Sequence, residues 1–158
     1  MAITTVYDSS QELTTSLAIL KEWILTYIPD TEIDYVPSRP TLNEGDILTK
    51  PIFHVEVLPG RKYNVGMGKR ISNSVRGKFH DVAAMLFITV TDDIGGMERV
   101  RQIADTLNWA FETQGYELNQ AGLKKAEISS LRELTKENYG PFYGSRFLIT
   151  FRTTIYFE

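Results

Sequence analysis

Residues 147–157 have the sequence FLITFRTTIYF, in which one set of alternate positions is almost entirely Phe and Ile and the other is more polar. A period of two is typical of a β-strand that buries one face. The segment is longer than the usual strand of five or six residues. We therefore expect it either in the centre of a sheet or paired with a neighbouring subunit, because a long apolar strand at an open edge favours aggregation.

Three other segments also have the composition of strands. Residues 52–57 alternate in the same way, with one wet face, and residues 82–90 are nearly all apolar, which indicates burial on both faces. Residues 126–134 fit either a strand or a helix. We favour a strand there, because the turn-forming residues 136–141 lead directly into the strand at 147–157.

Two amphipathic helices are predicted. The first starts at Ser9, where Glu12 three residues later fits a capping box, and it ends before Pro29. The second starts after the turn at residues 91–96, which Asp92 and Asp93 cap. The apolar positions of both helices recur at spacings of three and four residues. They are Leu13, Leu17, Leu20, Ile24 and Ile28 in the first helix, and Met97, Val100, Ile103, Leu107 and Phe111, ending near Gly115, in the second.

The elements follow in the order helix, strand, loop, strand, helix, strand, strand. Residues 30–50 are expected to be an extended connection, since Pro37 and Pro40 within it, Pro51 directly after it, and a turn argue against a regular element there. The sequence thus predicts a single α+β domain over residues 1–158. In it, two helices pack on one face of a mostly antiparallel sheet of about four or more strands.

Composition narrows the class of protein. The chain has 158 residues, which is enough for one domain with a sizeable core, and its net charge of −3 disfavours nucleic-acid binding by overall charge. The absence of cysteine excludes disulfides, thiolate metal sites and cysteine nucleophiles, and fits a cytosolic setting. The first residues do not resemble a signal peptide, and no apolar run approaches the roughly 18 residues of a spanning helix.

The most unusual segment is residues 60–80, which holds six basic residues and no acidic one. The rest of the chain has 11 basic and 20 acidic residues, so a charge of +6 here faces −9 elsewhere. Four glycines predict a flexible loop that contacts a partner, although a loop that is merely solvated is the plainer alternative. The basic residues are Arg61, Lys62, Lys69, Arg70, Arg76 and Lys78.

An acidic surface of another copy is a candidate partner for this loop. Residues 1–47 have eight acidic and two basic residues, and the four acidic residues that we favour for the contact are Glu32, Asp34, Glu44 and Asp46. Such a contact is head to tail and closes into a ring when the rotation allows. The acidic and basic segments would then set register and orientation.

No motif points to catalysis. His54 and His80 are predicted to be polar surface or loop residues, and the spacing of Gly66, Gly68 and Lys69 is not that of a phosphate-binding loop. No nucleophile has a base in sequence context, and no cluster has metal-ligand spacing. We therefore expect no catalytic residue, no metal site and no cofactor, and a protein that is not an enzyme.

The order of elements resembles that of the tail terminator proteins of tailed bacteriophages, also called neck terminator or tail completion proteins. The resemblance covers most of the chain as a pattern. The first helix is followed by the proline-spaced residues 37–40 and by residues 50–57. A long loop then leads to residues 82–90, with the helix at 97–111 behind them, and residues 141–152 begin the last strand.

This resemblance implies a structural protein of the virion, assembled in the host cytoplasm. It implies a hexameric ring at the head–tail junction that caps the tail tube, ends its polymerisation and joins it to the head connector. Its partners would be other copies, the tail tube protein and a head-connector or neck protein. Residues 60–80 would reach a neighbouring subunit or an adjoining ring. Lining the channel, with non-specific contact to the DNA, is the competing placement.

Two other functions stay open on the sequence. One is another phage neck or baseplate-proximal assembly protein of similar fold. The other is a small nucleic-acid-binding module, in which basic residues interleaved with Tyr63 and Phe79 would suit a single strand. The basic residues of that module would be Lys69, Arg70, Arg76 and Lys78.

Overall fold

The computed structural model describes residues 3–38, 40–43, 45–70, 76–135 and 142–157, and among these the side chains of residues 59–70, 76–78 and 157 lie outside the description. One five-stranded sheet has the order β1-β2-β3-β5-β4. All neighbours are antiparallel except β1 and β2. The strands are β1 Asp34–Tyr35, β2 Ile52–Arg70, β3 Arg76–Val90, β4 Lys124–Leu134 and β5 Tyr143–Phe157.

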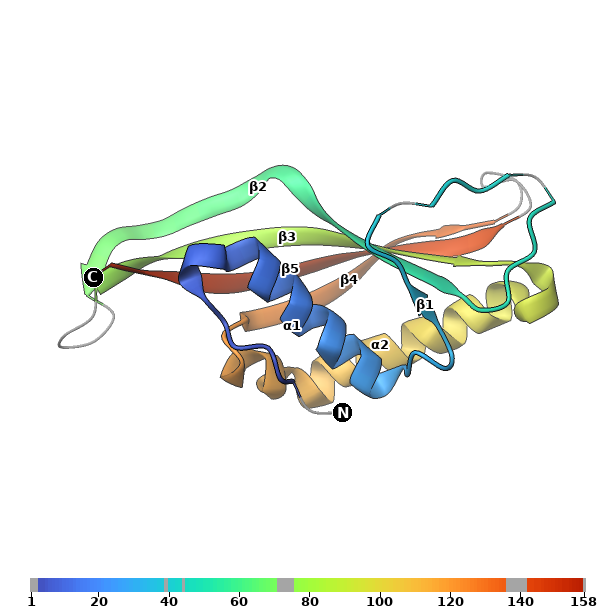
Figure 1. Cartoon of the computed structure of the whole chain (residues 1–158), viewed down its shortest axis with the longest axis horizontal. Coiled ribbons are helices and arrows are strands. Elements are labelled where there is room, and N and C mark those ends of the chain that lie inside the picture. The colour runs from blue at the N-terminus through green and yellow to red at the C-terminus, as the bar shows by residue number, and fades with distance from the viewer. Residues whose placement is uncertain (1–2, 39, 44, 71–75, 136–141, 158) are drawn as a thin grey trace.

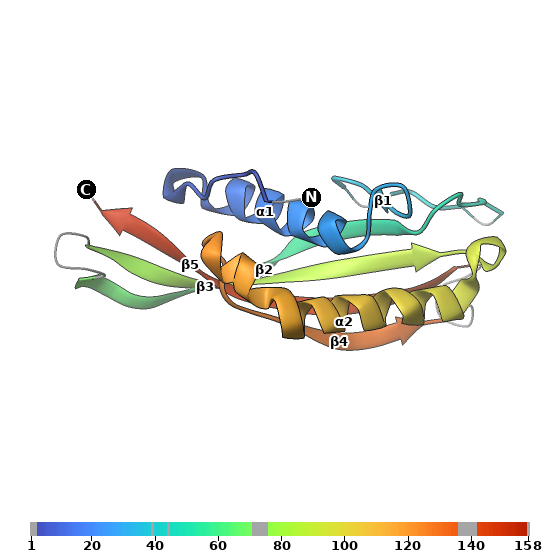
Figure 2. The ribbon, with the colours of Figure 1, turned by 90° about the horizontal axis from the view of Figure 1, so that it is seen from below.

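Two helices, α1 Glu12–Tyr27 and α2 Gly96–Gln120, lie on the same side of this sheet (Figures 1 and 2). The predicted α+β class, with two helices on one face of a mostly antiparallel sheet, is therefore confirmed. The strands expected at 52–57, 82–90, 126–134 and 147–157 all form.

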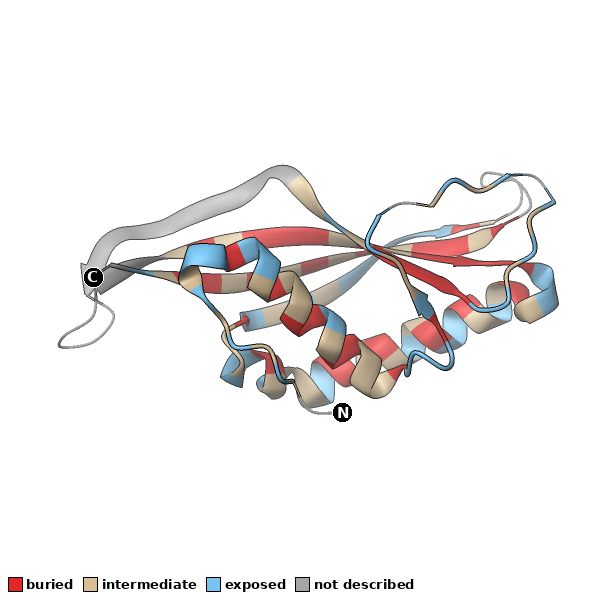
Figure 3. Ribbon diagram, viewed as in Figure 1, coloured by how far each residue is buried: buried red, intermediate tan, exposed pale blue. Residues whose placement is uncertain are grey.

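The core lies between the helices and the central strands β3 and β5. Leu86 and Ile88 of β3 and Phe147 and Ile149 of β5 are buried in one cluster with the apolar residues of both helices. Figure 3 shows buried stretches in red along the central strands and both helices. Trp23 of α1 lies among them and meets Phe111 of α2 edge to face, with 4.6 Å between ring centroids. β5 pairs with β3 on one side and with β4 on the other, so of the two positions predicted for this strand the central one is correct.

The predicted buried face of α1 is confirmed at Leu20, Ile24 and Ile28 and is wrong at Leu13. The capping box is wrong, because Asp8 precedes the helix and its carboxylate accepts the Ser10 amide at 2.9 Å. A 3-10 turn, Ser9–Gln11, follows, and α1 then starts at Glu12. Leu13 is 36% exposed, and the side that carries the large Trp23 is buried instead. The buried residues are Glu12, Ser16, Ile19, Leu20, Trp23 and Ile24.

Helix α2 continues five residues beyond the predicted end at Gly115. It stops where Gly122 adopts a φ of 109°, and the Leu123 amide donates to the Leu118 carbonyl at 2.9 Å. This is the pattern of a Schellman motif, in which the flanking apolar residues also pack together. Leu118 and Leu123 are both fully buried, so the apolar contact rather than the first glycine sets the end of the helix.

The connections differ from prediction at two places. The connection at 30–50 contains the short strand β1, whose flanking amides Asp34 and Val36 donate to the carbonyls of Pro51 and Phe53 at 2.8 and 2.9 Å. The prolines therefore do not exclude pairing here, because β1 ends before Pro37, the first of them. Asp92 and Asp93 start a separate 3-10 turn, and α2 itself begins after Gly95 without a side-chain cap.

Candidate functional site

The segment at 60–80 is not a loop along most of its length. Residues 60–70 belong to β2 and residues 76–80 to β3, and the two strands pair as far as Arg70 opposite Arg76. β5 continues the sheet on the other side of β3, to Phe157 opposite Arg76. Only residues 71–75 of this segment lie outside the description of the backbone. The prediction of a flexible loop is therefore corrected to the outer half of a β-hairpin.

We call this outer part of the sheet the arm, and define it as residues 62–70, 76–82 and 152–157. β4 begins at Lys124, opposite Arg152, so the arm has the three strands β2, β3 and β5. Figure 1 shows this end of the sheet extending past both helices. The arm is thus a projection from the body of the domain.

Glycines misled the prediction because they occupy bulges. The pairing of β2 with β3 shifts register between Val57 and Lys62, where Gly60 lies, and again between Val65 and Lys69, where Gly66 and Gly68 lie. A bulge accommodates a residue outside the ladder and often uses glycine. Tyr63 and Val65 lie between the bulges and favour a strand, as β-branched and aromatic residues do.

Five of the six predicted basic residues have a paired backbone position on the arm. Lys62 is opposite Val82, Lys69 opposite Gly77, Arg70 opposite Arg76, and Lys78 opposite Ile155 of β5. Arg61 falls in the first bulge, just below the arm. Their side chains lie outside the description, so their contacts stay a prediction.

The four predicted acidic residues lie away from the arm in the same chain. Asp34 is exposed on β1, which pairs with the first residues of β2, whereas the arm contains the last ones. Glu32 forms an ion pair with Arg99, with 3.5 Å between Oε2 and Nη2. A carboxylate oxygen of Asp46 accepts the Asn43 amide within a turn, and Glu44 lies outside the described residues.

An ion pair joins β3 and β5 at the base of the arm. Nε and Nη2 of Arg152 donate to the two carboxylate oxygens of Asp81 at 2.8 and 3.2 Å. This hydrogen bonding lowers the pKa of Asp81 below its ordinary value. The guanidinium also lies over the ring of Phe79, 5.7 Å from its centroid.

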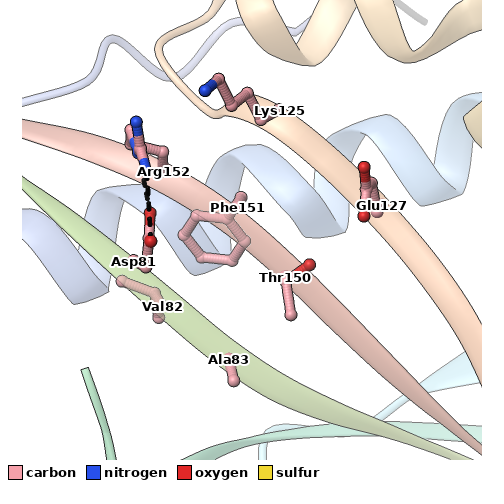
Figure 4. Close-up of a pocket in the computed structure, with 8 residues that line it drawn as sticks. All are labelled: Asp81, Val82, Ala83, Lys125, Glu127, Thr150, Phe151 and Arg152. Carbon is pink, nitrogen blue, oxygen red and sulfur yellow. Dashed lines mark hydrogen bonds and ion pairs between the residues drawn. The ribbon is translucent and has the colours of Figure 1, made fainter. Parts of the chain in front are cut away.

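A surface pocket of about 340 Å³ opens beside this ion pair (Figure 4). Lys125, Glu127 and Thr150 line its other side, from β4 and β5. Asp81 and Arg152 bond each other, and the rest of the pocket presents the ammonium of Lys125, the carboxylate of Glu127 and the hydroxyl of Thr150. This set can hold a polar side chain of a partner.

The Asp81–Arg152 pair predicts an acid-dependent contribution to stability. A lowered pKa in the folded state means that the contribution is present above the unfolded pKa of about 3.9 and is lost as the pH falls through the folded value. We expect Asp81→Asn to lower the free energy of unfolding by about 0.5–1 kcal/mol at pH 7, as for a half-exposed pair. Urea unfolding of both proteins at pH 7 and at about pH 2.5 measures the difference in their free energies of unfolding. The same difference at both pH values would contradict the prediction.

Both histidines are buried, which corrects their prediction as surface or loop residues. His80 lies at the base of the arm with Nδ1 2.8 Å from Oε2 of Glu12, in the first turn of α1. Nε2 of His54 lies 2.8 Å from Oε1 of Glu56 on the same strand, and its ring stacks on Phe87. An adjacent polar partner is what permits each imidazole to be buried.

The segment before α1 also holds the arm. The Tyr7 hydroxyl donates to the carbonyl of Thr154 in β5 at 2.7 Å, and burial raises the pKa of Tyr7 to about 12. Together with Glu12 and His80, this contact attaches the start of α1 to the base of the arm. The direction in which the arm projects is therefore fixed by buried contacts.

Sequence reasoning missed an exposed stripe along α2. Seven residues at spacings of three and four face away from the core, and all of them are exposed. The stripe has two aromatic side chains, Trp109 at 52% exposure and Tyr116 at 57%, and no basic residue. We call it the outer stripe of α2, and it consists of Glu98, Gln102, Asp105, Trp109, Glu112, Tyr116 and Asn119. The sequence does contain a signal for this stripe, because Trp109 and Tyr116 are seven residues apart and lie on the same face of a helix. A predicted helix end at Gly115 left Tyr116 outside the helix, so the pair was not recognised.

Within the described ranges, no three His, Cys, Asp or Glu side chains gather closely enough to hold a metal ion. No helix in that same part of the chain is long and apolar enough to cross a membrane.

Comparison with known proteins gives no family. No family model matches the chain, and no curated protein matches it either. Twenty chains of solved structures do match. One belongs to the virion of a native gene transfer agent particle, with a TM-score of 0.31 and 12% sequence identity over 85% of this chain and 84% of that chain. A likeness of this size supports no conclusion about function, and the arm and the surfaces around it remain the basis for one.

Proposed function

We propose that this protein is a structural subunit of a phage-type virion that assembles head to tail into a ring, hexameric by resemblance to tail terminators. The observation that carries the proposal is the arm. It projects from the domain and carries most of a segment with a charge of +6, while the rest of the chain carries −9. The arm and any acidic surface are different parts of one subunit, so a contact between them is heterologous and generates a ring or a filament.

In this role the ring caps the tail tube, ends its polymerisation and joins it to the head connector. Its partners are other copies, the tail tube protein and a connector or neck protein. The protein acts by assembly and not by catalysis, and it needs no cofactor. The buried contacts at the base of the arm support this role, because a projection that orients a neighbouring subunit must itself be held in one direction.

Absolute mass in solution tests the proposal. Six copies of the 18.0 kDa chain have a mass of about 108 kDa. Light scattering over a range of protein concentration and salt should detect this species, and negative-stain images should show rings. We expect high salt to weaken the assembly, since exposed charges are screened. A protein that stays monomeric at every concentration, and also when mixed with tail tubes, would contradict the proposal.

A second candidate function is binding of single-stranded nucleic acid by the arm. The observation that favours it is the interleaving of Tyr63 and Phe79 with basic residues on paired strands, where Tyr63 is opposite Asp81 and Phe79 opposite Val65. Stacking platforms with phosphate contacts bind strands without sequence preference and with strong salt dependence. A mobility shift at micromolar protein that disappears with salt, from a protein that does not self-associate, would favour this function over the ring.

A further inference from the structure

The outer stripe of α2 has an unusual charge balance for a solvent-exposed helix face. Three carboxylates, of Glu98, Asp105 and Glu112, lie on it with no lysine or arginine. Arg101 donates to both carboxylate oxygens of Glu133 at 3.1 and 3.2 Å. Arg99 pairs with Glu32, and it also donates to the side-chain oxygen of Gln102 on the stripe at 3.4 Å.

Basic residues of β4 lie near the far end of the stripe. Lys124 and Lys125 line a surface pocket together with Glu112, Tyr116 and Asn119. The stripe itself therefore carries an excess of negative charge, which lysines border only at its end near Asn119.

Trp109, the larger aromatic residue of the stripe, is supported by a ring of α1. Trp109 meets the ring of Tyr27 edge to face, at 6.1 Å between centroids, and Tyr27 meets the buried Trp23 at 5.2 Å. The Tyr27 hydroxyl donates to the carboxylate of Glu117. A large exposed indole supported in this way loses little entropy on binding, and tryptophan and tyrosine are enriched among the residues that dominate interfaces.

We propose that the outer stripe of α2 is the surface on which the arm of a second copy of this chain docks. The inference rests on the proposed head-to-tail assembly and names its partner surface. The charges are complementary, −3 on the stripe and +6 on residues 60–80. Lysine and arginine side chains also bind the faces of tryptophan and tyrosine rings, most strongly that of tryptophan. The docked arm thus gains ion pairs and cation–π contacts at once.

The dimensions of the two surfaces agree. The stripe extends from residue 98 to residue 119, which is about 31 Å of helix at 1.5 Å per residue. Residues 76–82 of the arm are about 20 Å long at 3.3 Å per residue. The stripe fits the arm better than the predicted acidic residues do, because Glu32 and Asp46 already have partners in their own chain.

Cross-linking between two single-cysteine variants tests this contact directly, because the chain has no cysteine of its own. One protein carries Arg70→Cys at the end of the described part of β2, and the other carries Glu112→Cys on the stripe. A short bis-maleimide is added to the mixture. Neither protein holds both thiols, so a mixed dimer reports one copy's arm on the other copy's α2. We expect this dimer to be at least tenfold more abundant than the dimer formed with either control position.

The controls are Ser129→Cys, exposed on β4, and Asp34→Cys, in the predicted acidic surface. Adding Asp105→Lys to the Glu112→Cys partner should lower the cross-link at least tenfold, and so should Trp109→Ala. Equal cross-linking at Glu112 and Ser129, or stronger cross-linking at Asp34, would overturn the inference. If rings form but the Arg70–Glu112 cross-link is absent, the docking surface proposed here is wrong and the proposed ring assembly still stands. A chain that never self-associates removes the proposed assembly as well.

Discussion

Removal of residues 151–158 unfolds the subunit. The deleted segment is the second half of β5, a central strand, and it pairs with residues 76–82 of β3. It contains Phe151 and Thr153, which are buried, and the Arg152 that bonds Asp81. Loss of one large buried aromatic side chain costs about 3–5 kcal/mol. A domain of this size has a free energy of unfolding of about 5–15 kcal/mol. We expect the loss of this side chain, together with the loss of half a strand's hydrogen bonds to β3, to exceed that free energy. Circular dichroism during heating should show no cooperative transition.

A shorter deletion provides the matched control. Removal of residues 155–158 shortens only the arm, and leaves Phe151, the Asp81–Arg152 pair and the carbonyl of Thr154 that Tyr7 contacts. We expect this variant to melt cooperatively, with a midpoint close to that of the full chain. A soluble, cooperatively melting protein that lacks residues 151–158 would show that the second half of β5 is peripheral.

We expect the reversal of four arm charges to weaken the proposed self-assembly and to leave the subunit folded. Lys69→Glu, Arg70→Glu, Arg76→Glu and Lys78→Glu together change the charge of residues 60–80 from +6 to −2. An arm of the same sign as the rest of the chain repels a neighbour, so association should weaken by well over tenfold, which is 1.4 kcal/mol. Sedimentation velocity measures the loss of the oligomer, and thermal melting checks the fold.

A pair of double variants separates the position of the charges from the net charge. Lys69→Glu with Arg70→Glu lies on the arm, and Lys50→Glu with Arg132→Glu lies at exposed positions outside the arm and the stripe. The two double variants alter the net charge equally. Only the arm variant should lose the oligomer. Equal loss from both would mean that overall charge sets association. An unchanged oligomer in the fourfold variant would remove the arm from the mechanism.

The strands were predictable because their signals are local. The alternation at 147–157 and the apolar run at 82–90 each identify a strand, and no tertiary information is needed. The position of β5 between β3 and β4 was left open, since alternation says that one face is buried but not which strands are neighbours. α1 shows the same limit. Its apolar period was correct at Leu20 and Ile24, yet the period alone did not show that Trp23 is buried and Leu13 exposed.

The errors at the candidate site have one cause: the conformation of each residue depends on tertiary contacts that its neighbours in the sequence do not reveal. Glycine in a bulge and glycine in a loop look the same in a sequence, so the arm was predicted as a loop although Gly60, Gly66 and Gly68 lie at register shifts. A buried imidazole needs a partner, and the partner of His80 is Glu12, far away along the chain. Spacing does not show such pairs. The outer stripe of α2 was missed for a simpler reason, because Gly115 was taken as the end of the helix.

The position of β5 next to β3 also has a consequence for the order of folding. β2 and β3 are joined directly and pair early, as hairpins do. α2 and β4 separate β5 from β3 in the chain, although the two strands are neighbours in the sheet. Pairing between segments so far apart in the chain is slow. During that interval the hairpin presents an apolar, unpaired β3 edge to every other chain in solution. We therefore expect this edge, which later lies at the centre of the sheet, to be the place where two partly folded subunits could exchange strands.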